Sequence, residues 1–149
     1  TMQQPSEIND DLLRAWKLKK MLDALDQMKG HQTSLISLFI SPSTQIPRIN
    51  SLITEGLGSA SCIKQTKTRN NVQEALRSIQ ARVKMFRQIP ENGVVIYCGV
   101  CTEDDGRERK MVELVEPPKP VSHFQYLCDS RFHTEALRKM LNTEPTYGY

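Results

Sequence analysis

Apolar side chains recur at helical spacing in the first part of the chain. The stripe consists of Leu18, Met21, Leu22, Leu25 and Met28, which follow one another at intervals of three and four positions. This spacing predicts an amphipathic helix. Asn and Asp at residues 9–11 offer a cap and an acidic first turn, and Gly30 marks the end of the pattern.

Two further helical patterns should pair as a hairpin. Residues 47–57 predict a helix with Pro47 at its first position and with Gly56 and Gly58 expected to end it. A longer helix follows residues 58–66. Its buried face is predicted to hold Val72, Ala75, Leu76, Ile79, Val83 and Phe86. We therefore expect residues 58–66 to form the tip of a helical hairpin.

Four runs of residues favour strands. Residues 33–40 (TSLISLFI) are apolar without polar alternation, as expected of a strand that is covered on both faces. Residues 93–101 and 107–115 predict two strands joined by the acidic turn at 103–106. Residues 126–129 predict a further short strand, after which Thr134 can cap a last helix.

The order of the elements is α-β-α-α-β-β-β-α. It predicts an α/β fold, a layered sandwich with a four-stranded β-sheet packed by helices and a protruding helical hairpin. The 149 residues suffice for one domain.

The net charge of +3 is unevenly distributed. Residues 64–87 hold seven basic residues and one acidic residue, a net charge of +6, which leaves −3 for the rest of the chain. A clustered positive field attracts polyanions such as nucleic acids. No apolar run approaches the roughly 20 residues of a membrane span, and no signal segment opens the chain. We therefore expect a soluble, cytoplasmic protein without a membrane partner.

The cysteine and histidine pattern gives little support to a metal or redox site. Cys98 and Cys101 have the C-x-x-C spacing, but they follow a β-rich run rather than a helix N-terminus. No second closely spaced pair of zinc ligands exists, since the other candidates stand singly: Cys62, Cys128, His31, His123 and His133. We favour a buried structural role for Cys98 and Cys101, and the acidic residues 103–105 are interpreted as a charged turn.

Enzyme activity is not indicated either. The sequence offers no paired nucleophile and base and no glycine-rich phosphate loop, so we expect neither catalytic residues nor a cofactor.

Single-stranded RNA is the polyanion that the remaining side chains fit best. Ser61, Cys62, Lys64 and Gln65 at the hairpin tip are small, polar or cationic enough to approach a base edge. Lys67 and Arg69 follow on the next helix as candidates for phosphate contacts.

A second RNA-contacting element is predicted in the last strand. Tyr126 and Cys128 alternate onto one face of that strand, so the phenol can be offered to a base. From residue type alone, however, a core position is favoured for Cys128 and Phe132.

Three segments together resemble a known family. They are Gly58-Ser-Ala-Ser-Cys-Ile-Lys-Gln65, Pro90-Glu-Asn-Gly93-Val-Val-Ile-Tyr-Cys98-Gly99, and Tyr126-Leu-Cys-Asp-Ser-Arg-Phe-His-Thr-Glu-Ala-Leu137. They resemble the N-terminal domain of the eukaryotic class-1 translation termination factor, the peptide chain release factor, from Trp16 to about Leu141. The resemblance implies recognition of stop codons in messenger RNA at the ribosomal decoding centre.

The same resemblance implies partners and boundaries. The partners are the mRNA stop codon, the small ribosomal subunit with its rRNA, and a class-2 release factor GTPase that binds through domains absent from this chain. Residues 9–142 would form the recognition domain, 1–8 a flexible tail and 143–149 the start of a linker. Peptide release in the family uses a Gly-Gly-Gln motif of another domain, and this chain has no Gly-Gly.

Residue by residue, the resemblance is partial. The family tip Asn-Ile-Lys-Ser corresponds to Cys62-Ile63-Lys64-Gln65, so Ile63 and Lys64 match, and the family lysine can be hydroxylated. The Tyr-x-Cys-x-x-x-Phe motif matches in full at Tyr126, Cys128 and Phe132.

Two other family elements are altered. A Gly-Thr-Ser element appears as Gln32-Thr33-Ser34, and a family glutamate falls on Gly56, with Glu55 one place earlier. Because the departures fall on reading positions, we hypothesise an altered stop-codon set. Drift in a tolerant loop, and a general single-stranded RNA-binding domain without codon specificity, are the alternatives.

Overall fold

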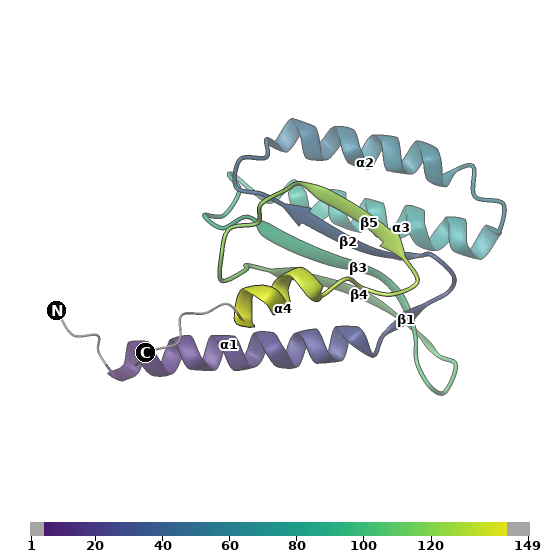
Figure 1. The fold of residues 1–149 in the computed structure, drawn as a ribbon. Helices are drawn as coiled ribbons and strands as arrows, with labels where there is room; N and C mark the ends of the chain where they lie inside the picture. The colour runs from purple at the N-terminus through teal and green to yellow at the C-terminus, as the bar shows by residue number, and fades with distance from the viewer. Residues whose placement is uncertain (1–4, 143–149) are drawn as a thin grey trace.

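An antiparallel sheet of five strands lies between two layers of helices (Figure 1). The computed structural model describes residues 5–142, with side chains from residue 10 onward. The elements are α1 (Pro5–Asp26), β1 (Lys29–Gly30), β2 (Leu35–Ile40), α2 (Ile46–Ala60), α3 (Thr66–Val83), β3 (Val94–Thr102), β4 (Glu108–Val115), β5 (Gln125–Asp129) and α4 (Glu135–Asn142). The predicted α/β sandwich with a helical hairpin is confirmed.

Strand β3 is the centre of the sheet. One edge of β3 pairs with β4. The other edge pairs with β2, where Ile36 lies opposite Cys98, and with β1 at its end, where Lys29 lies opposite Thr102. β2 in turn pairs with β5, so that β5 is an edge strand.

Each face of the sheet has its own apolar core. The hairpin α2–α3 covers one face, where Ile36, Leu38 and Ile96 pack against Ile53 and Leu76. The helices α1 and α4 cover the other face (Figure 1). Its core consists of Leu22, Leu25, Leu35, Phe39, Val95, Tyr97, Cys101, Val115, Val121, Phe132 and Leu137. Both faces of β2 and β3 are thus buried, which explains why their sequences lack polar alternation.

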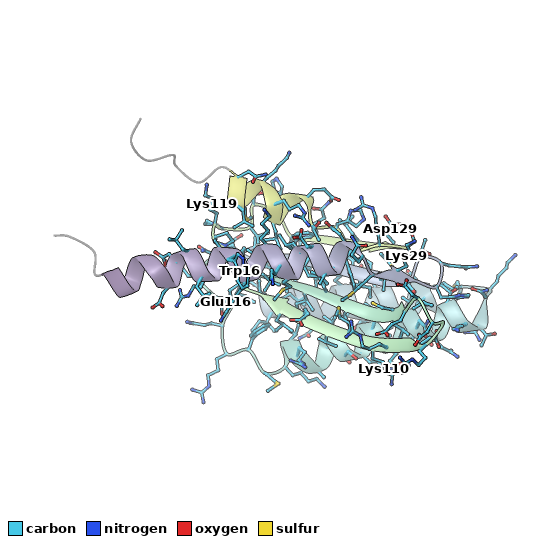
Figure 2. All side chains as sticks on the ribbon, turned by 90° about the horizontal axis from the view of Figure 1, so that it is seen from below. Trp16, Lys29, Lys110, Glu116, Lys119 and Asp129 are labelled. Carbon is cyan, nitrogen blue, oxygen red and sulfur yellow. The ribbon has the colours of Figure 1, made fainter. Side chains whose placement is uncertain are left out.

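Only the C-terminal part of α1 packs on the sheet. Leu22 and Leu25 are buried, whereas Leu12, Leu13 and Trp16, in the N-terminal and middle part of the helix, are exposed. Trp16 lies near the middle of α1 (Figure 2), with the Lys20 amine 4.3 Å from the centroid of its ring.

The structure differs from the predictions in several helix and strand bounds and in the number of strands; α3, for example, ends at Val83, although Phe86 was predicted on its buried face. α1 begins at Pro5 rather than near Asn9, since proline is well tolerated in a first turn, so residues 5–8 are helical. α2 continues through Gly56 and Gly58 to Ala60. The sheet has a fifth strand, β1, which is too short to show a sequence pattern. Residues 1–4 of the predicted tail at 1–8, and the predicted linker at 143–149, lie outside the described residues.

The connection into β3 requires a glycine. Gly93 has a φ of +82°, and a Cβ atom there would lie 2.1 Å from the carbonyl oxygen of Ile40. Its amide closes the turn by donating to the carbonyl of Pro90 at 2.8 Å. This turn joins the helical hairpin to the central strand, and it thereby fixes the position of the hairpin relative to the sheet.

Candidate nucleic-acid interface

Three segments meet at one end of the molecule: the α2–α3 tip, the β1–β2 loop at residues 31–34, and the C-terminal end of β5 (Figure 1). His31 Nε2 lies 3.1 Å from Oε1 of Gln65 at the tip. The Cys128 thiol of β5 donates to the carbonyl of Thr33 at 3.2 Å. The Gly30 amide donates to the carbonyl of Ser130 at 3.1 Å. The loop therefore bridges the two elements that the sequence singled out, and we call this combined region the tip surface.

The hairpin tip presents Lys64 to solvent. Ile63 packs against the core, and the Arg69 guanidinium donates to the Ile63 carbonyl at 3.2 Å. Ser61 Oγ donates to the Gly58 carbonyl at 2.5 Å, and the exposed Cys62 makes only a long contact of 4.0 Å to the same oxygen. No ion pair or hydrogen bond joins Lys64 to another described residue, so its amine is available to an external acceptor.

Tyr126 and Cys128 share the face of β5 that the hairpin covers, as predicted. Both are half-buried. Burial raises the pKa of Tyr126, and the neighbouring Cys128 raises it further. Burial likewise raises the pKa of Cys128, which its hydrogen bond with Tyr126 partly opposes. Both side chains therefore remain protonated at neutral pH, and within the fold the Cys128 thiol is directed to the Thr33 carbonyl while the Tyr126 hydroxyl hydrogen bonds with Cys128.

Two predicted site residues are buried away from this surface. Phe132 is 0% exposed and lies in the other layer, edge-to-face with Tyr97 at a centroid distance of 5.4 Å. The core position favoured for Phe132 from its residue type is confirmed. Ser34 is also 0% exposed, and its Oγ has no partner among the described residues. Of the Gln32-Thr33-Ser34 element, only Gln32 and Thr33 are exposed, because the chain enters the buried strand β2 at this point.

The residue after Phe132 fixes the end of β5. The His133 amide donates to Ser37 Oγ at 2.9 Å, and the Tyr97 hydroxyl donates to the His133 carbonyl at 2.8 Å. His133 Nε2 lies 2.9 Å from the Asp129 carboxylate. Hydrogen bonds from the Ser130 amide and from His133 lower the pKa of Asp129. These contacts hold β5, and with it Tyr126, in a fixed position.

Glu55 does not belong to the tip surface. It is exposed and lies two positions from the buried Ile53, about 200° around α2 and therefore on the opposite side of the helix. Position 56 faces α3 instead, since a Cβ on Gly56 would lie 3.2 Å from Leu76. Glu55 and the glutamate position of the family pattern thus face different surroundings.

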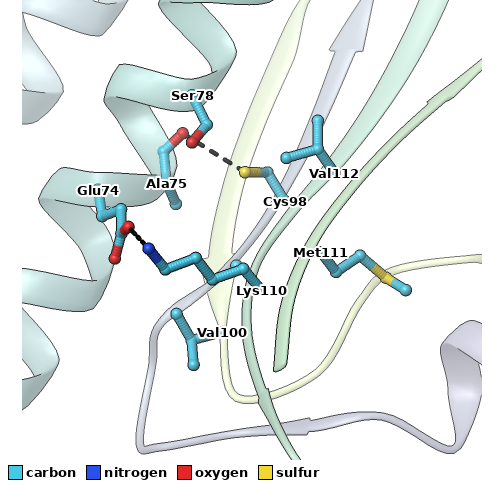
Figure 3. A pocket seen from close by; sticks show the side chains of 9 residues that line it. Glu74, Ala75, Ser78, Cys98, Val100, Lys110, Met111 and Val112 are labelled. Carbon is cyan, nitrogen blue, oxygen red and sulfur yellow. Dashed lines mark hydrogen bonds and ion pairs between the residues drawn. The ribbon is translucent and has the colours of Figure 1, made fainter. Parts of the chain in front are cut away.

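The positive charge near the tip is partly neutralised within the fold. Lys67 pairs with Glu108 of β4 at 2.8 Å. Lys110 of β4 pairs with Glu74 of α3 (Figure 3). Toward the other end of α3 and beyond it, Arg77, Lys84 and Arg87 are exposed. Basic residues therefore remain available to phosphates mainly at Lys64 and at the far end of α3.

Cys98 and Cys101 are buried, as predicted for a structural role. The Cys98 thiol donates to the Ala75 carbonyl at 3.5 Å, and burial, followed by the nearby Glu74, raises its pKa to about 12. Beside it lies a cavity of about 20 Å³, lined by Ser78, Val100 and Met111 among others, which has room for about one water molecule (Figure 3). Within the described residues, no three His, Cys, Asp or Glu side chains are placed to share a metal ion.

No helix in the described part of the chain combines the length and the apolar content needed to cross a bilayer.

Sequence reasoning missed two polar residues of the tip surface, His31 and Thr68. Thr68 is buried, and its hydroxyl hydrogen bonds with Gln32 Oε1 at 3.1 Å and with Gln65 Oε1. The sequence signal that could have pointed to these residues was that Gln32 and Gln65 both depart from the family pattern. They are 33 positions apart in the sequence. Their meeting at Thr68 follows from the packing of the loop against the hairpin.

Comparison with known proteins identifies the family. Residues 13–142 match the family described as eRF1 domain 1. The eukaryotic peptide chain release factor subunit 1 of Saccharomyces cerevisiae is 39% identical over 137 residues, which are 92% of this chain and 31% of that protein. The Cryptosporidium hominis protein of the same name is 38% identical over 141 residues, 95% of this chain and 33% of that protein. The chain thus spans about a third of the length of these relatives.

The fold agrees with this relationship. The crystal structure of an archaeal translation termination factor, aRF1, superposes with a TM-score of 0.76 at 28% identity, covering 85% of this chain and 34% of the archaeal chain. Another solved archaeal protein gives a TM-score of 0.81 at 29% identity, over 87% of this chain and 36% of the archaeal chain. The chain therefore belongs to the eRF1 domain 1 family, the N-terminal domain of eukaryotic peptide chain release factor subunit 1.

Proposed function

We propose that this domain recognises stop codons in messenger RNA within the ribosomal decoding site during translation termination. The observation that carries the proposal is the meeting of Lys64, Thr33, Tyr126 and Cys128 at one end of the fold, joined by the bonds of residues 31–34. The exposed cation of Lys64 and the exposed hydroxyl of Thr33 provide donors for base edges, and the half-buried Tyr126 lies on the adjoining strand β5.

We further propose that the stop-codon set of this domain is altered. Three of the four departures from the family pattern, at Gln32, Cys62 and Gln65, lie on the tip surface, and none of these three belongs to the two apolar cores. The fourth, Gly56, faces Leu76 of α3. Replacing an asparagine amide by the Cys62 thiol removes a group that both donates and accepts hydrogen bonds. Such a change alters the complementarity of the site to a base edge.

The proposal extends to partners and processing. The domain would act on the small ribosomal subunit and its rRNA in the cytoplasm, and a class-2 release factor GTPase would bind other parts of the longer protein. It would bind RNA without catalysing release, because no catalytic set accompanies the tip surface. The exposed Lys64 amine is a candidate for hydroxylation.

A general single-stranded RNA-binding domain is the second candidate. The exposed Arg77, Lys84 and Arg87 favour it, since phosphate contacts of this kind carry no sequence information. The two candidates differ in how binding responds to base sequence and to salt.

Titration of the isotopically labelled 149-residue chain with short RNAs separates the two functions. The RNAs differ only in one triplet, which is UAA, UAG, UGA or the sense triplet UAC, and binding is followed by amide chemical shifts at two salt concentrations. We expect shifts at residues 61–65 and 126–128. We also expect the affinity for at least one stop triplet to be at least about threefold higher than the affinity for UAC. Equal affinity for all triplets with a steep salt dependence would instead indicate general RNA binding.

A further inference from the structure

Two departures from the family pattern meet at one buried hydroxyl. Thr68 lies in the first turn of α3 and is 2% exposed. Its Oγ1 lies 3.1 Å from Oε1 of Gln32 in the β1–β2 loop and also hydrogen bonds with Oε1 of Gln65 at the hairpin tip. His31 Nε2 lies 3.1 Å from the same Gln65 oxygen. A single polar cluster therefore connects loop and tip.

The hydrogen bonds of this cluster occupy the groups that would otherwise reach RNA. A threonine hydroxyl carries one proton, so Thr68 donates to one glutamine carbonyl and can accept from the turned amide of the other. Gln65 Oε1 accepts from Thr68, and His31 Nε2–H is placed to donate to it as well. Although the Gln65 side chain is exposed, its carbonyl oxygen is thereby already engaged by two groups of the protein rather than left free for a base edge.

The backbone conformation of Gln32 also indicates that this loop depends on the polar cluster. Its φ is +57°, and Gln32 is the one non-glycine residue of the described chain with a positive φ. A left-handed conformation is unfavourable for a residue with a Cβ atom, a penalty that the glycine of the family pattern would not have. The hydrogen bond to Thr68 is a contact through which the folded loop offsets this cost.

We propose that Gln32, Gln65, Thr68 and His31 form an interlock that sets the position of Thr33 relative to Lys64, and that this spacing determines which stop codons are accepted. The inference rests on the proposed function and deepens it. Gln65 and Thr68 act as positioning residues. The substitutions at 32 and 65 change codon choice as a pair, through geometry, rather than by each adding a new contact to a base.

The structural part is tested on the 149-residue chain without RNA. Thr68→Val removes the hydroxyl at nearly constant volume, and Thr68→Ser restores it. We expect backbone order parameters of residues 32–34 to fall from about 0.85 to below about 0.6 in the valine variant and to recover in the serine variant. Thr66→Val, which removes an exposed hydroxyl on the same turn, is the matched control and should leave them unchanged. Unchanged order in Thr68→Val would overturn the interlock.

The functional part uses the domain joined to the middle and C-terminal domains of a relative. In a reconstituted termination assay, Thr68→Val should change the ratio of release rates between stop codons by about fivefold, the equivalent of one hydrogen bond, while Thr68→Ser keeps the ratio. A simple loss of folded protein would lower release at every codon equally and leave the ratio untouched.

A double-mutant cycle tests the pairing of the two glutamines. The effect of the double variant Gln32→Gly with Gln65→Ser on the ratio of release rates between stop codons should differ from the product of the two single effects. This coupling should vanish in the Thr68→Val background. Independent, multiplicative effects would overturn the paired role. If the parent protein shows no preference for stop codons at all, the proposed function fails, while the order parameters still decide whether the interlock exists.

Discussion

Replacing Phe132 with alanine is expected to lower the free energy of unfolding by about 3–5 kcal/mol, the usual loss for a fully buried aromatic ring. The ring packs edge-to-face on Tyr97 in the core beneath α1 and α4. Urea unfolding of the 149-residue chain measures the loss. Phe124, which is only partly buried and lies under Arg48, is the matched control, and Phe124→Ala should cost clearly less.

The same residue separates a packing role from a reading role. Phe132→Leu keeps an apolar side chain in the core, so it should retain the release ratio between stop codons while lowering stability. A loss of under about 1 kcal/mol in Phe132→Ala would contradict the core assignment. A changed ratio of release rates between stop codons in Phe132→Leu would instead support the contact with RNA that the family motif implies for Phe132.

Replacing Lys64 with alanine is expected to lower release at every accepted stop codon by roughly 10- to 100-fold, the range for losing a charged hydrogen bond. The Lys64 side chain is exposed at the tip. Its removal should therefore change the free energy of unfolding by less than about 0.5 kcal/mol. Release rates of the joined protein and urea unfolding of the domain measure the two effects.

Lys84 provides the control for charge alone. It is an exposed lysine at the C-terminal end of α3, far from the tip along the same helix. Lys84→Ala should reduce binding only modestly and equally for all codons, through the general attraction to phosphate. If Lys64→Ala had no greater effect than Lys84→Ala, the tip lysine would be one cation among several and not a recognition residue.

The layered fold was predictable because its signals are local. The apolar runs of β2 and β3, the stripe of α3 and the turn before β4 each specify one element from a few neighbouring residues. The end of α2 was not predictable in the same way. Gly56 and Gly58 stand where a helix often ends, yet Gly56 allows close packing on Leu76 of α3, and this tertiary contact supports three further residues of helix.

The site was predictable in its parts and not in its assembly. The alternation of Tyr126 and Cys128 identified their common face, and the sequence identified the tip. The hydrogen bond of Gln32 could not be predicted, since its partner Thr68 is 36 positions away. The burial of Ser34 depends on the point where the loop enters β2, which sequence patterns locate only within a few residues.

The most direct test of stop-codon recognition is a reconstituted termination assay on UAA, UAG, UGA and a sense codon, with this domain joined to the middle and C-terminal domains of a relative. The relative with its own first domain is the matched control. We predict release at one or more stop codons, a rate at least about tenfold lower at another, and none above background at the sense codon. Equal release at all three stop codons would contradict the altered codon set, and comparable release at the sense codon would contradict recognition itself.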